Sequence, residues 1–457
     1  MICRSRCLVS LIMLPLLGMT AFSTGPGETA TAAGKYNGPG SCAASSCHGS
    51  VQPKHLTPIL QDEYSIWIAQ DKHARAFAAL SNPVSVRMGK ILNTKCADGK
   101  PCPPSEAPKC LACHSLSVPP DERAQTFDMT DGVSCESCHG PASGWLGPHT
   151  VKDWPHEKSV ALGMYDTRNL IKRSEKCLTC HLGTADKFVD HEMIAAGHPD
   201  LTFELSYFSF YMPRHWKTPE QGNAWRDVQA LGVGQAVQLR ESLYRLARRA
   251  EGPNWPEYAE LDCFACHHSL TAPGDSWRLT TANYYEGRRP GNPAWNESRV
   301  VVFRVMAEEL HPDTAKRLSD DLVQLAELMN QLNGNRTEII TTAKKSAAVA
   351  GDLAIQFDSQ PYDPALTLRL MRRIAAKGNA IAADGERPAE QAAMALDVLY
   401  RAYQQNSNQM PAVRSSLDSL IQLVQQNPSY YSAPRYEAQM QKVSEALGGR
   451  SEASGAN

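Results

Sequence analysis

The feature of this sequence that most constrains its fold is a cysteine pair closed by a histidine, which the chain repeats five times. Four copies have two residues between the cysteines, and the fifth has four. The strict copies are Cys110/Cys113/His114, Cys135/Cys138/His139, Cys177/Cys180/His181 and Cys263/Cys266/His267, and the stretched copy is Cys42/Cys47/His48. Together they use ten of the fourteen cysteines and five of the fourteen histidines. Such repetition indicates that every copy performs the same chemical task.

The strict pattern is the signature of covalent haem c attachment. Two thiols add to the vinyl groups of the porphyrin, and the histidine after the second cysteine lies under the iron as its proximal ligand. Structural zinc or a disulfide framework also uses paired cysteines, but neither requires a histidine at this position in every copy. We therefore predict five covalently attached haem c groups. For the stretched copy the alternative is a local disulfide between Cys42 and Cys47.

The first 32 residues have the pattern of a secretory signal peptide. A basic start precedes an apolar run from Cys7 to Phe22, and small residues follow. Cleavage is expected near residue 23 or near residue 32. Export agrees with the chemistry, because bacteria attach haem c outside the cytoplasm, so a periplasmic or other extracytoplasmic location is predicted. The run is short for a membrane span of about 20 residues, so membrane association is expected only if the leader is retained.

Two further features limit the remaining possibilities. Cys96 and Cys102 enclose a short loop without a following histidine, and in an oxidising compartment they are predicted to form a disulfide. The formal net charge is −2, with both signs distributed along the chain and no basic block. A nucleic-acid partner is therefore not expected.

The composition predicts a mainly α fold in two parts. All five motifs lie between Cys42 and His267, in a region rich in proline and glycine with few apolar runs of its own. We expect a multihaem cytochrome domain over residues 33–290, in which the macrocycles provide the core and the chain forms short helices and loops. The rest of the chain to residue 447 contains no cysteine and is rich in alanine, leucine and glutamine. It is predicted to form an α-helical bundle or stack of helical hairpins over residues 291–447, followed by a disordered tail over 448–457.

Apolar residues at helical spacing predict the individual helices. The expected segments are 62–80, 222–249, 318–332, 338–357, 363–376, 388–405, 412–426 and 435–447. The sequence Asn333-Gly334-Asn335 ends the third of these.

A resemblance to a known family rests on several motifs in a fixed order. They are Trp67 with Asp71-Lys-His73-Ala-Arg-Ala, Cys110-Leu-Ala-Cys113-His114, Asp131-Gly-Val-Ser-Cys135-Glu-Ser-Cys138-His139-Gly-Pro141, Gly147-Pro-His149 and Lys176-Cys177-Leu-Thr-Cys180-His181. Between about Gly40 and Leu182 the chain resembles the cytochrome c-554 family, secreted cytochromes with four closely packed c-type haems. It departs from the family in the fifth motif, the helical extension and the stretched first motif.

The resemblance implies some of the distal iron ligands. His149 is similar in position to the distal ligand of the haem on His48, and His73 to that of the haem on His139. The haem on His114 is implied to be five-coordinate, with a vacant distal face.

The remaining histidines are assigned less completely. His191 and His198 are seven residues apart, so on a helix they project from one face, and we predict that they serve the haems on His181 and His267. The alternative is that one of them binds a haem propionate. His268 is interpreted as a propionate or surface residue and His311 as structural. His55, His156 and His215 stay unassigned, and any of them could close the haem on His114.

Three functions follow, in order of preference. The first is electron transfer between redox-partner proteins through closely packed, mostly bis-histidine haems, with no catalytic residue. The alternative is a haem enzyme that turns over a small nitrogen or sulfur compound at an open iron on His114. The third is a haem sensor or a structural subunit of a respiratory complex, with the C-terminal helices as its docking surface.

Overall fold

The computed structural model describes residues 34–57, 59–217, 225–263, 266–267, 292–331, 333–426 and 431–449. The expected signal peptide and all but two residues of the expected tail lie outside these ranges. The described chain is mainly α-helical and forms no β-strand, which confirms the predicted fold class. None of its helices is long and apolar enough to cross a membrane.

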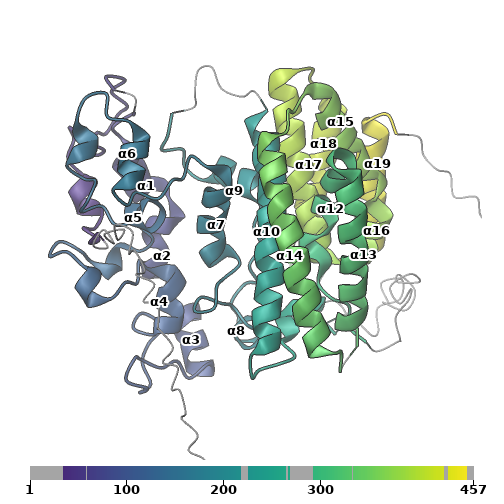
Figure 1. The fold of residues 1–457 in the computed structure, drawn as a ribbon, viewed down its shortest axis with the longest axis horizontal. Coiled ribbons are helices and arrows are strands. Elements are labelled where there is room, and N and C mark those ends of the chain that lie inside the picture. The colour runs from purple at the N-terminus through teal and green to yellow at the C-terminus, as the bar shows by residue number, and fades with distance from the viewer. Residues whose placement is uncertain are drawn as a thin grey trace, which may run out of the picture.

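The first part of the chain consists of short helices joined by long loops (Figure 1). These helices are α1 (Glu63–Gln70), α2 (Ala76–Ala79), α3 (Pro83–Ile91), α4 (Pro108–His114), α5 (Cys135–His139), α6 (His156–Ala161), α7 (Leu170–His181), α8 (His191–Ala195) and α9 (Leu205–Tyr211). Helices α4, α5 and α7 all end at the histidine of a cysteine motif. Because residues three apart face the same side of a helix, both cysteines of each of these motifs lie on one face.

The sequence predicted one helix over residues 62–80, whereas the structure breaks it at Asp71. Asp71 has an extended backbone (φ −77°, ψ 132°), and its side chain accepts a hydrogen bond from the His73 backbone N–H. It therefore ends α1 and caps a new 3₁₀ turn, Lys72–Arg75. This break sets the position of His73.

The second part is a body of long helices. They are α10 (Arg226–Glu251), α12 (Val301–Leu310), α13 (Pro312–Met329), α14 (Arg336–Ser359), α15 (Pro364–Ala376), α16 (Gly378–Ala383), α17 (Glu386–Asn406), α18 (Pro411–Val424) and α19 (Ala433–Ala446). Their starts follow local signals: the side chains of Asn335 and Asp363 cap α14 and α15, and a proline opens α13, α15 and α18. Helices α12 and α16 are additional to those predicted.

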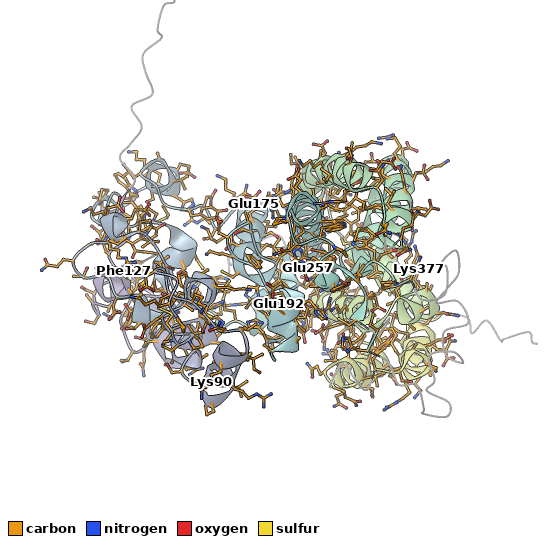
Figure 2. The ribbon with its side chains drawn as sticks, turned by 90° about the horizontal axis from the view of Figure 1, so that it is seen from below. Lys90, Phe127, Glu175, Glu192, Glu257 and Lys377 are labelled. Atoms are coloured by element: carbon orange, nitrogen blue, oxygen red, sulfur yellow. A yellow bond between two sulfur atoms is a disulfide. The ribbon has the colours of Figure 1, made fainter. Side chains whose placement is uncertain are left out.

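Helix α10 joins the two parts. It is buried on nearly all sides, with α7 and α9 against one side and α12, α14 and α17 against the other (Figure 1). One hydrophobic core runs from Leu170 and Leu178 on α7 through α10 to the last helices. Helix α10 lies within the predicted cytochrome domain of residues 33–290 and also packs against the long helices, and the boundary at residue 290 stays a prediction. Seen from below, Glu175, Glu192 and Glu257 lie between the loop-rich part and the helical body (Figure 2).

The predicted disulfide between Cys96 and Cys102 is confirmed, with the two Cα atoms 5.5 Å apart. It closes a hairpin-like loop in which the Cys102 backbone N–H donates to the Thr94 carbonyl. This leaves ten free cysteines among the described residues, and all ten belong to the five motifs.

A buried carboxyl group lies where α9 meets α10. Glu204 is fully buried and caps α9, since its Oε2 accepts the Tyr207 backbone N–H at 2.5 Å. Its other oxygen, Oε1, has no hydrogen-bond partner among the described residues. Desolvation by burial raises the pKa of Glu204 from 4.5 to about 7.

We expect Glu204→Gln to stabilise the protein above pH 7. The carboxyl group has a pKa of about 4.5 in the unfolded chain and about 7 in the folded protein. Between these two pH values only the unfolded chain is ionised, so the folded protein becomes less stable as the pH rises. The amide removes this cost, so the gain should approach roughly 3 kcal/mol at pH 8 and vanish near pH 4. Denaturant unfolding followed by circular dichroism at both pH values measures it, and an equal effect at both would contradict the assignment.

Candidate functional site

Four pairs of histidine rings lie at nearly the same separation. The ring centres are 6.2 Å apart for His48–His149 and His73–His181, and 6.3 Å apart for His114–His198 and His191–His267. The planes of His48 and His149 are parallel to within 2°, whereas the angles of the other pairs are 86°, 89° and 30° in the same order. Each pair contains at least one histidine from a cysteine motif.

This separation fits a metal ion between the rings. A metal–imidazole bond is about 2 Å long, and the nitrogen lies roughly 1 Å from the ring centre, so two imidazoles on opposite sides of one ion have centres about 6 Å apart. Direct stacking would bring them closer, and hydrogen bonding between the rings would tilt them into other arrangements. The four pairs therefore fit bis-histidine haem iron, and when bound the haem would supply a one-electron redox centre.

Hydrogen bonds at Nδ1 orient most of these rings. The Nδ1 atoms of His114 and His198 donate to the carbonyls of Ala76 at 2.9 Å and Pro199 at 2.7 Å. His149 Nδ1 donates to the carbonyl of Leu146 at 2.6 Å. A carbonyl only accepts, so the proton must be on Nδ1 and the lone pair on Nε2 is free for a metal.

The Nδ1 atoms of His48 and His73 have carboxylate partners instead. His48 Nδ1 lies 3.0 Å from Glu63 Oε2, and His73 Nδ1 lies 3.0 Å from Asp71 Oδ1. These hydrogen bonds raise the pKa of both histidines, against the opposing effect of burial. Burial favours the neutral form of both acids, but hydrogen bonds from the histidines outweigh it and lower the pKa of Glu63 and Asp71. Both carboxyl groups are therefore ionised at neutral pH.

His139 differs from the other four motif histidines. Among the residues that the structure describes, its ring has no ring contact with a second imidazole. Desolvation, followed by the charges of His215 and His48, lowers the pKa of His139 to about 4, so its ring is neutral and has a free lone pair. His215 therefore lies near enough to His139 for its charge to act on that ring.

Contacts between cysteines bring different motifs together. The thiols of Cys42 and Cys135 lie close enough to interact, and so do those of Cys113 and Cys180. The motif of His48 therefore adjoins that of His139, and the motif of His114 adjoins that of His181.

The motif of His267 is described at Cys263, Cys266 and His267. Cys266 is exposed, as is Cys138 in the motif of His139, whereas Cys263 is partly buried. The backbone N–H groups of Cys266 and His267 both donate to the Cys263 carbonyl, at 3.2 and 2.8 Å. The second of these hydrogen bonds has the spacing of an α-helical one. Attachment of haem to Cys263 and Cys266 stays a prediction.

The structure differs from the ligand partners that the sequence suggested. His149 lies beside His48, which is the pair that the resemblance implies, and its ligation of iron stays a prediction. His73 was assigned to the haem on His139, but its ring lies beside His181. The break at Asp71 and the hydrogen bond from the Val133 N–H to the His73 carbonyl direct it there.

The segment with His191 and His198 also differs from expectation. The two were assigned to the haems on His181 and His267, and the implied vacancy was on His114. In the structure His191 lies beside His267, but His198 lies beside His114. Helix α8 ends at Ala195, so the chain turns before His198 and the two rings do not share one helix face.

The other histidines do not form such pairs. His156 Nε2 is 3.0 Å from Asp166, and His311 packs in the helical body with its ring centre 5.7 Å from that of Phe357. His55 is exposed, and His215 donates its Nδ1 proton to the Pro213 carbonyl at 3.2 Å. His268 lies outside the described residues.

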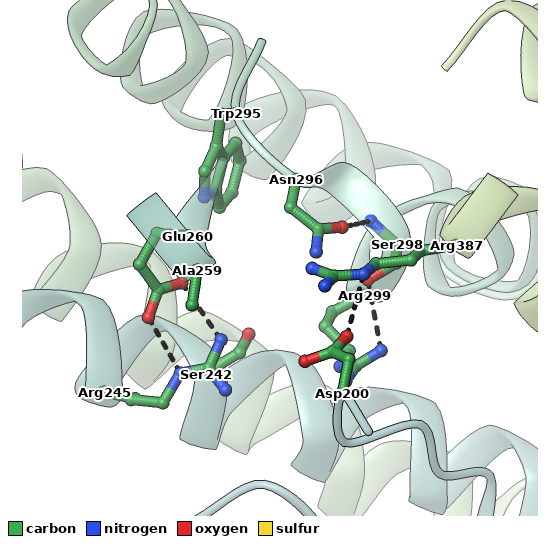
Figure 3. Close-up of a pocket in the computed structure, with 10 residues that line it drawn as sticks. All are labelled: Asp200, Ser242, Arg245, Ala259, Glu260, Trp295, Asn296, Ser298, Arg299 and Arg387. Carbon is green, nitrogen blue, oxygen red and sulfur yellow. Dashed lines mark hydrogen bonds and ion pairs between the residues drawn. The ribbon is translucent and has the colours of Figure 1, made fainter. Parts of the chain in front are cut away.

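A buried group of ion pairs connects the candidate site to the helical body (Figure 3). Arg387, at the start of α17, binds Asp200 at 2.8 Å, and Asp200 follows His198 by two residues. Arg245 on α10 pairs with Glu260 at 2.9 Å, just before the motif of His267. A cavity of about 20 Å³ lies among these residues, which is room for one water molecule. The group therefore holds the segments bearing His198 and Cys263 against α10 and α17.

The motifs, the helical fold and the histidine geometry define a c-type cytochrome, an electron-transfer protein with covalently bound haem c. Residues 41–140 match the family model described as cytochrome c554 and c-prime, and this similarity supports the assignment to the c-type cytochromes. The matched segment contains the motifs of His48, His114 and His139. No curated protein and no solved structure matches the chain.

We expect His198→Ala to convert one low-spin haem to high-spin, because it removes the imidazole opposite His114. Electron paramagnetic resonance (EPR) of the oxidised protein measures the change. His55→Asn is the control, since His55 is exposed and its φ of 53° is tolerated by asparagine. A wild-type spectrum for His198→Ala would show that His198 is not a ligand.

Proposed function

We propose that this protein is a secreted pentahaem cytochrome that transfers electrons between redox-partner proteins through mostly bis-histidine haems. The observation that carries the proposal is the 6.2–6.3 Å separation of four histidine pairs, each including a motif histidine. Two strong ligands on an iron leave no position for substrate, which suits electron transfer. The proposed ligands are His48 with His149, His181 with His73, His114 with His198, and His267 with His191.

Contacts between motifs support an order for the electron path. Cys42 with Cys135 connects the first haem to that on His139, and Cys113 with Cys180 connects the haems on His181 and His114. Cys138 lies close enough to Cys177 for their charges to interact, which supports neighbouring positions for the haems on His139 and His181. His191 and His198 lie on one short segment, which brings the haem on His267 next to that on His114. The proposed path runs from His48 through His139, His181 and His114 to His267.

A second candidate function is binding or turnover of a small nitrogen or sulfur compound at one haem. Its support is that His139, unlike the other four motif histidines, has no ring contact with a second imidazole among the described residues. This moves the candidate open position from His114, which the resemblance implied, to His139.

The proposed location is extracytoplasmic. Haem c attachment outside the cytoplasm and the leader-like pattern of the first 32 residues support it. The donor and acceptor proteins are proposed only as redox partners, one at each end of the path.

We expect the processed protein to exceed its polypeptide mass by five haems. Four haems would mean that Cys42 and Cys47 form a disulfide instead. In that case His48→Ala should leave the absorption spectrum unchanged, whereas with five haems it perturbs one of them.

We also expect EPR of the oxidised protein to resolve different ligand geometries. Nearly perpendicular imidazole planes leave two iron d orbitals almost degenerate and produce strongly anisotropic low-spin signals, which we assign to the pairs with angles of 86° and 89°. Parallel planes produce a rhombic signal, expected for His48–His149. A high-spin signal from a fifth haem would support the second candidate function, and five low-spin haems would contradict it.

A further inference from the structure

Two of the oriented imidazoles differ from the others in the charge of their Nδ1 partner. His114, His149 and His198 donate to neutral backbone carbonyls. His73 and His48 donate to the carboxylates of Asp71 and Glu63. The haem on His114 thus has carbonyl partners on both sides, whereas the haems on His181 and His48 each have one carboxylate.

Two hydrogen bonds hold the Asp71 carboxylate beside the His73 ring. One oxygen, Oδ1, accepts both the backbone N–H of His73 at 2.9 Å and its ring Nδ1–H at 3.0 Å. The residue is only 3% exposed, so water screens its charge poorly. The geometry leaves the side chain no freedom to move away from the ring.

Glu63 is held in a similar way beside His48. Its Oε1 accepts the backbone N–H groups of Leu60 at 2.9 Å and Gln61 at 3.2 Å, which directs Oε2 to His48. The Glu63 side chain is 15% exposed, so its charge is partly desolvated.

A carboxylate on Nδ1 pulls the shared proton away from the ring and increases the electron donation of Nε2 to the metal. A more basic ligand and a nearby negative charge both stabilise ferric over ferrous iron, which lowers the reduction potential. The carbonyl partners of His114 and His198 lack this charge.

We propose that Asp71 and Glu63 act as positioning residues that set the potentials of their haems. Acting through His73 and His48, they hold the haems on His181 and His48 at lower potential than the haem on His114. This difference favours electron movement along the path from His48 towards His114. The inference rests on the proposed function, because it assigns each carboxylate to a haem of that path.

The test is Asp71→Asn in the full-length holoprotein. The asparagine oxygen can accept both hydrogen bonds of Asp71 Oδ1, so the cap and ring orientation persist while the negative charge is lost. One of the two strongly anisotropic EPR signals should then titrate at higher potential. We expect a change of about tenfold in its reduction equilibrium, which is about 59 mV for one electron.

Two further variants make the test specific. Asp62→Asn is the matched control, since Asp62 is similarly buried, at 7% exposure, and has no hydrogen bond to an imidazole. It should shift every potential by less than Asp71→Asn does. Glu63→Gln should instead raise the potential of the rhombic signal assigned to His48–His149, and it provides the decisive result if Asp71→Asn does not assemble.

The outcomes separate the two proposals. Unchanged potentials in Asp71→Asn, or equal shifts in Asp62→Asn, with five haems and an intact low-spin spectrum would overturn the carboxylate inference and leave the proposed function standing. Fewer than five haems by mass, or no strongly anisotropic signal in the unmodified protein, would contradict the proposed function and with it the assignment of Asp71 to a haem.

Discussion

The interaction on which this structure depends is the hydrogen bond at Nδ1 that orients most of the paired imidazoles. A ring that can rotate cannot keep a fixed separation from a partner ring on another segment. In four pairs that separation is 6.2–6.3 Å, although the segments come from loops, short helices and a 3₁₀ turn. Backbone carbonyls and the carboxylates of Asp71 and Glu63 at Nδ1 fix the tautomer as well as the direction of most of these rings. The local fold therefore orients the candidate ligands before any metal binds.

The helical body contacts the segments that carry the histidine pairs. Helix α10 lies between them, with α7 and α9 packed on one side and the C-terminal helices on the other. The ion pairs of Arg387 on α17 with Asp200 and of Arg245 on α10 with Glu260 hold the segments near His198 and Cys263 against these two helices. Such pairs are strongly destabilising to break when they are buried. The body thus contacts the segments that carry His198 and Cys263.

Much of this could be predicted from the sequence because it depends on local patterns. Apolar spacing located the long helices, the cysteine motifs located the candidate attachment positions, and the spacing of Cys96 and Cys102 located the disulfide. The partners of His73 and His198 could not be predicted this way. Which ring lies opposite His181 depends on the break at Asp71, and which lies opposite His114 depends on the chain turning after Ala195. Both are tertiary outcomes of single capping and turn residues.

The four ring pairs also extend beyond the segment that matches the family model. The segment that matches the c554 family ends at residue 140, yet every pair takes at least one histidine from beyond it. His48 lies beside His149, His73 beside His181, and His114 beside His198, while His191 and His267 both lie outside. Residues 41–140 alone would therefore hold three attachment motifs whose histidines lack the partners seen here. The later segments, which form ion pairs with α10 and α17, carry the rings that lie beside these histidines.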